Sequence, residues 1–100
     1  MIKLAVVTEQ RAEQELKDAY LWYEGKAAGL GNRFLAEVEK ALKKVQIQPE
    51  MFPKKKGNYR TIHLNVFPYL LIYEVLKKEE IILLLSVFHG KRNPKIKYGK

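Results

Sequence analysis

Hydrophobic positions follow two different periods along this chain. In residues 9–24 and again in 30–47, apolar residues recur every three or four positions, which is the spacing of an amphipathic helix. After residue 57, short apolar runs are separated by turn residues, which is typical of strands. The pattern predicts two helices followed by a sheet.

The first half of the chain opens with a β-branched run, Ile2–Val7, which predicts a strand. Thr8 is expected to cap the first helix, because an acidic turn follows it. The second helix is expected over Leu30–Ile47, and Pro49 marks its end. Only a few residues link the two helices, so they should form an antiparallel hairpin.

The second half predicts three strands, over residues 58–67, 68–76 and 80–88. Pro68 fixes a tight corner between the first two, and residues 77–80 form a hairpin turn. We therefore expect one α+β domain over residues 1–100: an N-terminal strand, a helical hairpin, and a three-stranded antiparallel meander. All strands should form one sheet, with the helices on one face.

The last strand is apolar on both faces, which indicates a central strand covered on both sides. Ile81, Leu83, Leu85 and Val87 are expected on one face, with Ile82, Leu84 and Phe88 on the other. The helical hairpin can cover only one face. The second face is either a docking surface or is covered by Trp22, Phe52, Phe67 and the tail.

Composition narrows the class of protein. There is no cysteine, which removes disulfides, thiolate metal sites and a cysteine nucleophile. No apolar run approaches the ~20 residues of a membrane span, and the N-terminal apolar stretch is too short for a signal peptide. We expect a cytoplasmic domain that needs no membrane, no metal and no cofactor.

The net charge of +8 is distributed unevenly. Residues 1–53 hold eight Lys/Arg and eight Asp/Glu, whereas residues 54–100 hold eleven Lys/Arg and three Asp/Glu. This asymmetry points to an anionic partner, such as nucleic acid, an acidic protein segment or a membrane surface. The alternative is an ordinary lysine-rich solvated surface.

Two basic clusters carry the excess charge. They comprise Lys54, Lys55, Lys56 and Arg60 before and within the first predicted strand of the meander, and His89, Lys91, Arg92, Lys95 and Lys97 after the last. In a meander the first and third strands run in the same direction, so the two clusters should lie at opposite ends unless the chain folds back.

These residue types suit RNA cleavage by a 2′-hydroxyl. That reaction needs a base, an acid and cations for the charge on phosphorus, and histidine, lysine and arginine can supply all three. Arg60 attracts attention because it interrupts an apolar strand. A salt bridge from Arg60 to Glu74 on the next strand is its structural explanation.

The chain resembles the RelE/ParE toxins of type II toxin–antitoxin systems, which include plasmid stabilisation proteins. The likeness covers nearly the whole chain. It rests on "AEQELKDAYLWYEGKAAGLGNRFLAEVEKAL", Pro49, the next "FP", Arg60, "FPYLLIYEV" and "LLLSVFHGKRNP", in that order.

The resemblance implies a cytoplasmic toxin neutralised by a cognate antitoxin, which wraps it with an acidic segment. RelE-like members cut messenger RNA on the ribosome without a metal, and ParE-like members poison DNA gyrase. For the nuclease, the resemblance implies catalytic roles for Lys54, Lys56, Arg60, His89 and Arg92. Nucleic-acid contacts are implied for Lys54, Lys55, Lys56, Arg60, Lys91, Arg92, Lys95, Lys97 and Tyr98.

The ending "FHGKRNP" departs from the ribonuclease pattern, and the long hairpin with "WYE" and "GLG" is closer to the ParE side. Whether the protein is an enzyme therefore stays open. The remaining alternative is a non-toxic basic nucleic-acid-binding module or an inactive toxin remnant.

Overall fold

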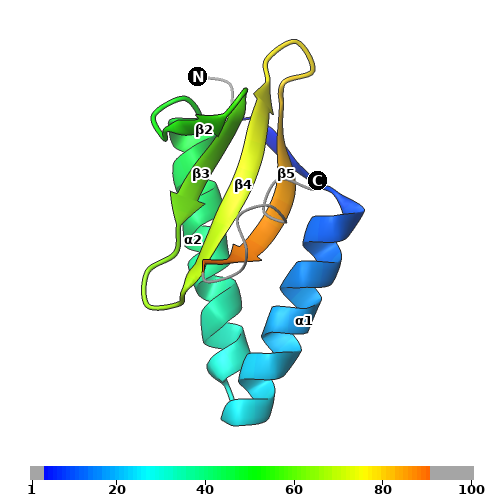
Figure 1. Cartoon of the computed structure of the whole chain (residues 1–100), viewed down its shortest axis with the longest axis vertical. Helices are drawn as coiled ribbons and strands as arrows, with labels where there is room; N and C mark the ends of the chain where they lie inside the picture. The colour runs from blue at the N-terminus through cyan, green and yellow to red at the C-terminus, as the bar shows by residue number, and fades with distance from the viewer. Residues whose placement is uncertain (1–3, 91–100) are drawn as a thin grey trace.

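The computed structural model describes residues 4–90. The elements follow one another as β1 (Ala5–Thr8), α1 (Gln10–Lys26), α2 (Leu30–Ile47), β2 (Lys54–Lys56), β3 (Tyr59–His63), β4 (Tyr69–Leu76) and β5 (Ile81–His89). The strands form one sheet in the order β1-β5-β4-β3-β2. Figure 1 shows α1 and α2 packed as a hairpin on one face of this sheet. The predicted α+β fold is confirmed.

The two helix starts are capped in different ways. Glu9, rather than Thr8, precedes α1, because Thr8 is still paired with Leu84 as the last residue of β1. At the hairpin turn, the Glu24 carboxylate accepts hydrogen bonds from the N–H groups of Gly29 and Gly31, both at 2.9 Å. An acidic side chain therefore satisfies two of the free amides at the start of α2.

Antiparallel pairing joins β2 to β3, β3 to β4 and β4 to β5, whereas β1 pairs with β5 in parallel. Both edge strands are short. β1 reaches only to Leu84 on β5, and β2 reaches Arg60 on β3. The sheet therefore has five strands at one end and three at the other, so the outer edges of β3 and β5 lack a neighbouring strand over their second halves.

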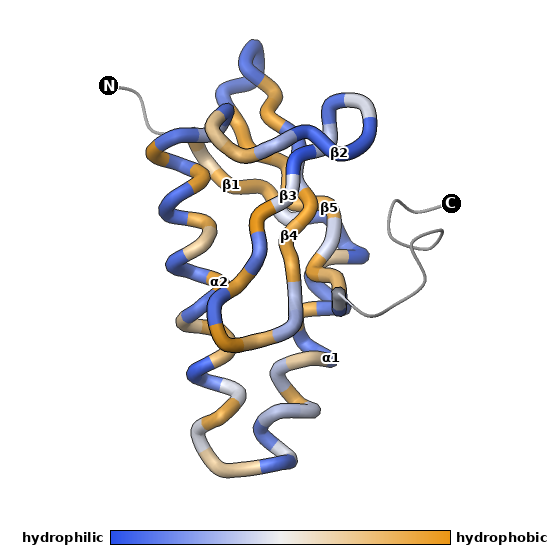
Figure 2. Tube along the Cα trace, turned by 60° about the vertical axis from the view of Figure 1, so that its left-hand side comes forward, coloured by the Kyte–Doolittle hydropathy of each residue, from blue (hydrophilic) through white to orange (hydrophobic). Residues whose placement is uncertain are grey.

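The main core lies between the helices and the sheet. It combines Ala12, Ala19, Tyr23, Phe34, Val38, Ala41 and Val45 of the helices with sheet residues that include Ile62, Leu71, Tyr73, Ile82 and Leu84. Figure 2 shows the hydrophobic segments of α2, β3 and β4 next to one another, and it shows β2 as hydrophilic.

A bulge in β5 changes the alternation of its side chains. The register shifts where Ile72 pairs with Ser86 and Tyr73 pairs with Leu84, so Leu85 has no partner. Val87 consequently joins the helix-side core together with Ile82 and Leu84. The predicted placement of Val87 on the face of Ile81, Leu83 and Leu85 is wrong.

The second face of the sheet is closed at its centre. Leu70, Ile72 and Phe88 are only 1–2% exposed, and Tyr59 and Leu85 pack against them. The three aromatic residues that one of the two alternatives placed over this face lie elsewhere, and the tail of that alternative lies outside the described residues. Phe67 and Phe52 pack into the helix-side core, and Trp22 is 58% exposed on α1.

The corner between β3 and β4 is longer than predicted and contains a tight turn. β3 ends at His63, four residues before the predicted end of that strand. Val66 has φ +74° and stands at the centre of a three-residue turn, closed by a 2.8 Å hydrogen bond from the Phe67 N–H to the Asn65 carbonyl. A β-branched residue rarely adopts this conformation, and the strand pattern gave no sign of it.

Candidate functional site

Arg60 lies on the helix side of the sheet. Its partner on β4 is Tyr73, whose side chain is in the helix-side core, and residues directly opposite each other point to the same face. One terminal nitrogen of Arg60 donates to the carbonyls of Glu50 at 3.0 Å and Phe52 at 2.8 Å. The side chain is only 12% exposed. Arg60 therefore fixes the loop between α2 and β2.

The ionic partner of Arg60 is Glu50 at 3.9 Å, rather than the predicted Glu74. Lys77 also pairs with Glu50, at 2.9 Å. The hydrogen bond from Lys77 is the main cause that lowers the pKa of Glu50, and the positive charges of Lys77, Arg60 and Lys54 act in the same direction. This exposed carboxylate offsets the charge of Arg60 on its solvent side.

Tyr73 supports the same loop from the core. Its hydroxyl donates to the Pro49 carbonyl at 3.1 Å. Burial raises the pKa of Tyr73 to about 12, and the nearby Arg60 charge opposes this in part. Arg60 and Tyr73 together provide hydrogen bonds for the carbonyls of residues 49, 50 and 52.

Lys54, Lys55 and Lys56 form the edge strand β2, which the sequence analysis treated as a loop. All three are exposed. Lys54 is opposite Arg60 and Lys56 is opposite Tyr59, with a register shift between them. Lys54 and Lys56 therefore belong to opposite faces of the sheet.

His89 ends β5, opposite Tyr69, and the two rings are 5.0 Å apart in an edge-on arrangement. Arg60 is level with Leu84, which lies five residues before His89 and two strands away. Because Leu85 is the extra residue of the bulge, the two levels are four residues apart on β4, which at about 3.3 Å per residue is roughly 13 Å along the sheet. The expectation that the two basic clusters lie at opposite ends holds for their described members.

The proposed catalytic set is thus only partly brought together. Lys54 and Arg60 are neighbours, Lys56 faces the other way, and His89 is remote. Arg92 of the catalytic set lies outside the described residues. So do the predicted nucleic-acid contacts Lys91, Lys95, Lys97 and Tyr98. Within residues 4–90, no three His, Asp or Glu side chains gather as metal ligands would.

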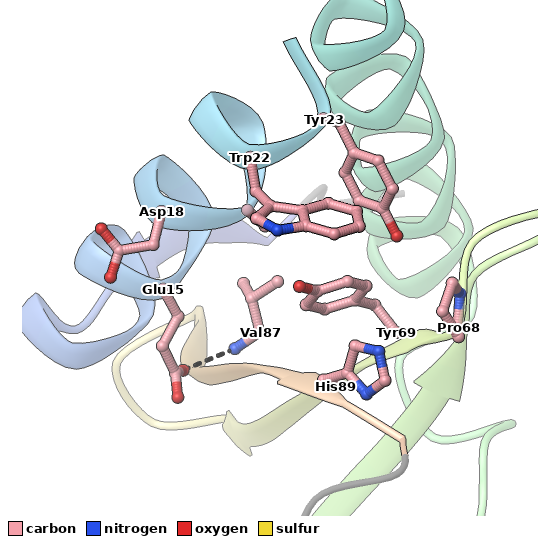
Figure 3. A pocket seen from close by; sticks show the side chains of 9 residues that line it. Glu15, Asp18, Trp22, Tyr23, Pro68, Tyr69, Val87 and His89 are labelled. Atoms are coloured by element: carbon pink, nitrogen blue, oxygen red, sulfur yellow. Dashed lines mark hydrogen bonds between the residues drawn. The ribbon is translucent and has the colours of Figure 1, made fainter. Parts of the chain in front are cut away.

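A pocket of about 720 Å³ lies between α1 and the far end of β4 and β5. Figure 3 shows Trp22 above Tyr69 and His89, with Glu15 and Asp18 at one side. The sequence predicted no role for Glu15 and Asp18, and the alternative that placed Trp22 over the second face of the sheet is wrong.

Glu15 is the main polar group of this pocket. One carboxylate oxygen accepts hydrogen bonds from the Ser86 hydroxyl at 2.7 Å and the Val87 N–H at 2.9 Å. Its other oxygen pairs with Arg11 at 3.3 Å. The Glu15 side chain is 16% exposed. Glu15 lies between Ala12 and Ala19 on the buried stripe of α1. An acidic residue within this apolar stripe was the sequence signal that could have identified it as a functional or structural residue.

A second hollow lies at the opposite edge, where β3 continues beyond β2. This β3 notch has a volume of about 290 Å³ and is lined by Lys44, Phe52, Pro53, Lys55, Thr61, Ile62 and His63. None of these lining residues is acidic. Lys44 comes from the last turn of α2, Lys55 from β2 and His63 from β3, so residues of three elements line the notch.

No helix within residues 4–90 combines the length and the apolar character that a bilayer crossing requires. This finding concerns the described helices alone.

Residues 6–94 match the family model described as "ParE toxin of type II toxin-antitoxin system, parDE". A search of curated proteins found no significant match. Among solved structures, the chain is similar to one described as a chromosomal ParDE toxin–antitoxin system from P. aeruginosa. The two are 16% identical, the match covers 89% of this chain and 98% of that one, and the TM-score is 0.73.

Two E. coli structures are also similar. A mutant of the toxin RelE in complex with an antitoxin RelB peptide is 19% identical, with 97% of this chain and 92% of that one covered and a TM-score of 0.68. The isolated RelE toxin is 16% identical, with 95% and 93% covered and a TM-score of 0.64. At such identities the structural likeness establishes the fold.

Proposed function

Because the chain belongs to the family of ParE toxins of type II toxin–antitoxin systems, we propose that it stops growth by inhibiting DNA gyrase. It does so in the cytoplasm, where gyrase acts on DNA. A cognate antitoxin neutralises it. The chemistry is non-nucleolytic: the protein holds its target through surface contacts and needs no cofactor.

The observation that carries this proposal is the position of Arg60. An arginine that stabilises phosphorus charge must present its donors to the RNA. Here one terminal nitrogen of Arg60 donates to the carbonyls of Glu50 and Phe52, on the helix side of the sheet, and the other lies 3.9 Å from the Glu50 carboxylate. Releasing the two carbonyls would break two hydrogen bonds from a charged donor, which costs about 1 kcal/mol each. Arg60 is therefore assigned a structural role.

The separation of His89 from Lys54 and Arg60 supports the same conclusion. Proton transfer requires the base and the acid to contact one substrate at hydrogen-bond distance. A level difference of roughly 13 Å along the sheet argues against His89 and Lys54 serving one phosphodiester.

A cognate antitoxin is the expected partner, because the descriptions of two similar structures name an antitoxin or a toxin–antitoxin system. One is a ParDE system and the other is a complex of RelE with a RelB peptide. The net charge of +8 favours an acidic antitoxin segment. Exposed apolar residues on α1, Leu21 and Trp22, offer the anchors that such a segment needs.

The proposal is tested with purified toxin in two parallel assays. One incubates the toxin with gyrase, ATP and supercoiled plasmid, and measures DNA breaks trapped by detergent and protease. The other maps cuts in messenger RNA on translating ribosomes by primer extension. We expect trapped DNA breaks, no new cuts at the ribosomal A site, and loss of the effect on adding the cognate antitoxin.

Arg60→Lys serves as the matched variant, since it keeps the charge and can still donate to a carbonyl. New A-site cuts that depend on Arg60 would instead establish the RelE-like endoribonuclease. If neither gyrase nor ribosomes respond while the folded protein binds nucleic acid, the non-toxic binding module is the correct alternative.

A further inference from the structure

We propose that the β3 notch binds a backbone phosphate of duplex DNA, so that the toxin contacts DNA directly. This inference rests on the proposed inhibition of gyrase only for the biological role of DNA binding. Its physical claim concerns the isolated toxin, and its principal residues are Lys44, Lys55 and His63.

The notch exists because β2 is too short to cover β3. Strand pairing ends at Lys54 and Arg60, and the Thr61 N–H donates once more to the Pro53 carbonyl at 3.2 Å. Beyond this point the chain has turned away toward α2, so Ile62 and His63 border the hollow.

The charge around the notch is of one sign. Lys44 and Lys55 supply ammonium groups, and the His63 imidazole can donate a hydrogen bond. Two other hollows of the described residues contain acids: Glu15 and Asp18 of α1 line one, and Glu50, Glu74 and Glu79 line the other, near Lys77. Lys43, which precedes Lys44 in α2, is also exposed.

The apolar part of the notch argues against unpaired bases. Proteins that hold single strands stack the bases on exposed aromatic rings. Phe52 is the one Phe, Tyr or Trp residue that lines the notch, and it is half-buried and packs against the main core. A shallow hollow with cations and no exposed Phe, Tyr or Trp ring suits the phosphates of a duplex, which position a protein without reading sequence.

Lys44 also has a structural role, because a cation in the last turn complements the negative end of the α2 dipole. The DNA-binding variants must therefore be compared under conditions in which each is folded to the same extent as the wild type. Lys55 lies in the exposed edge strand and does not share this role.

The experiment measures the binding of a short fluorescent DNA duplex to the purified toxin by anisotropy, over a series of salt concentrations. We expect Lys44→Glu and Lys55→Glu each to weaken binding about tenfold at low salt, and each to reduce the salt slope by about one. Lys17→Glu is the matched control: it makes the same charge change at an exposed position on α1, and should weaken binding less than about twofold.

Equal weakening by all three variants would overturn the proposal, because it would mean diffuse attraction to a +8 protein. Unchanged binding by Lys55→Glu would also overturn it, whatever Lys44→Glu does. A single-stranded RNA of equal length is the second arm, and tighter RNA binding with the same lysine dependence would reject duplex DNA as the ligand.

The gyrase assay distinguishes this failure from that of the proposed function. Trapped DNA breaks that persist in Lys44→Glu and Lys55→Glu, with unchanged duplex binding, would leave gyrase inhibition standing and end the phosphate site. Weakened duplex binding without any trapping by the wild type would support the site and reject the gyrase target.

Discussion

The two open edges of the sheet are bordered by side chains of opposite charge. Where β5 continues past β1, the Glu15 carboxylate accepts the Val87 N–H and the Ser86 hydroxyl, so an acid from α1 takes the place of a missing strand. Where β3 continues past β2, the neighbouring side chains are lysines and a histidine.

This difference indicates that the β5 edge is structural and that the β3 edge is a binding surface. An edge whose polar groups are satisfied by the protein's own side chain is protected from unwanted strand pairing. Apart from the interaction of Lys44 with the negative end of the α2 dipole, an edge surrounded by like charges gains nothing from them in folding, because like charges repel one another. The cations near β3 are therefore better explained by an external anion, and the carboxylate near β5 by stability.

The largest expected effect is at the β5 edge. Glu15→Ala removes a charged acceptor from two donors and one partner of Arg11, and should lower the free energy of unfolding by about 2–3 kcal/mol. Urea unfolding measures it. Glu13→Ala, at an exposed site on the same helix, is the control. An equal loss in both variants would contradict a special role for Glu15.

Arg60→Ala should come next, with a loss of about 2 kcal/mol, since the carbonyls of Glu50 and Phe52 lose a charged donor. Arg60→Lys should recover part of this loss. Thermal unfolding of both variants checks the order. A stability of Arg60→Ala equal to the wild type would mean that the guanidinium does not fix the loop, and would remove the main support for the non-nucleolytic proposal.

Tyr73→Phe should cost about 1 kcal/mol near neutral pH, because the hydrogen bond to the Pro49 carbonyl is lost. Tyr73 also predicts a pH dependence. Its pKa is raised from 10.0 to about 12, so from pH 10 to 12 the folded state binds more protons than the unfolded state.

Stability should therefore fall as the pH rises through this window, and Tyr73→Phe should fall less steeply than the wild type. Urea unfolding at several alkaline pH values gives the two slopes. Parallel slopes would assign the alkaline loss to other groups.

The smallest effect on stability is expected at the β3 edge. Lys55→Glu changes an exposed side chain and should alter the free energy of unfolding by no more than about 0.5 kcal/mol. Urea unfolding beside Glu15→Ala makes the contrast direct. A large loss in Lys55→Glu would show that the cations of this edge also serve folding.

Much of the architecture could be predicted from the sequence because it follows from side-chain period. The helices, the meander and the opposite placement of Arg60 and His89 all follow from local patterns and chain direction. The side chain of Arg60 could not be placed this way, because its face depends on register, and its partners are carbonyls of a loop without a pattern.

The candidate surfaces were harder to predict for the same reason. Glu15 matters because α1 brings it to Val87, which is 72 residues away in the chain. The β3 notch depends on where β2 stops, and three consecutive lysines give no periodic signal for a strand. Both are consequences of packing between distant segments.

The pairing of β1 with β5 has a consequence for how the protein is made. Ala5 pairs with Ile81, so the first strand of the nascent chain has no partner until the last strand leaves the ribosome. At about 5–20 residues per second, the intervening stretch takes roughly 4–15 s to synthesise. During that interval the polypeptide lacks its complete sheet.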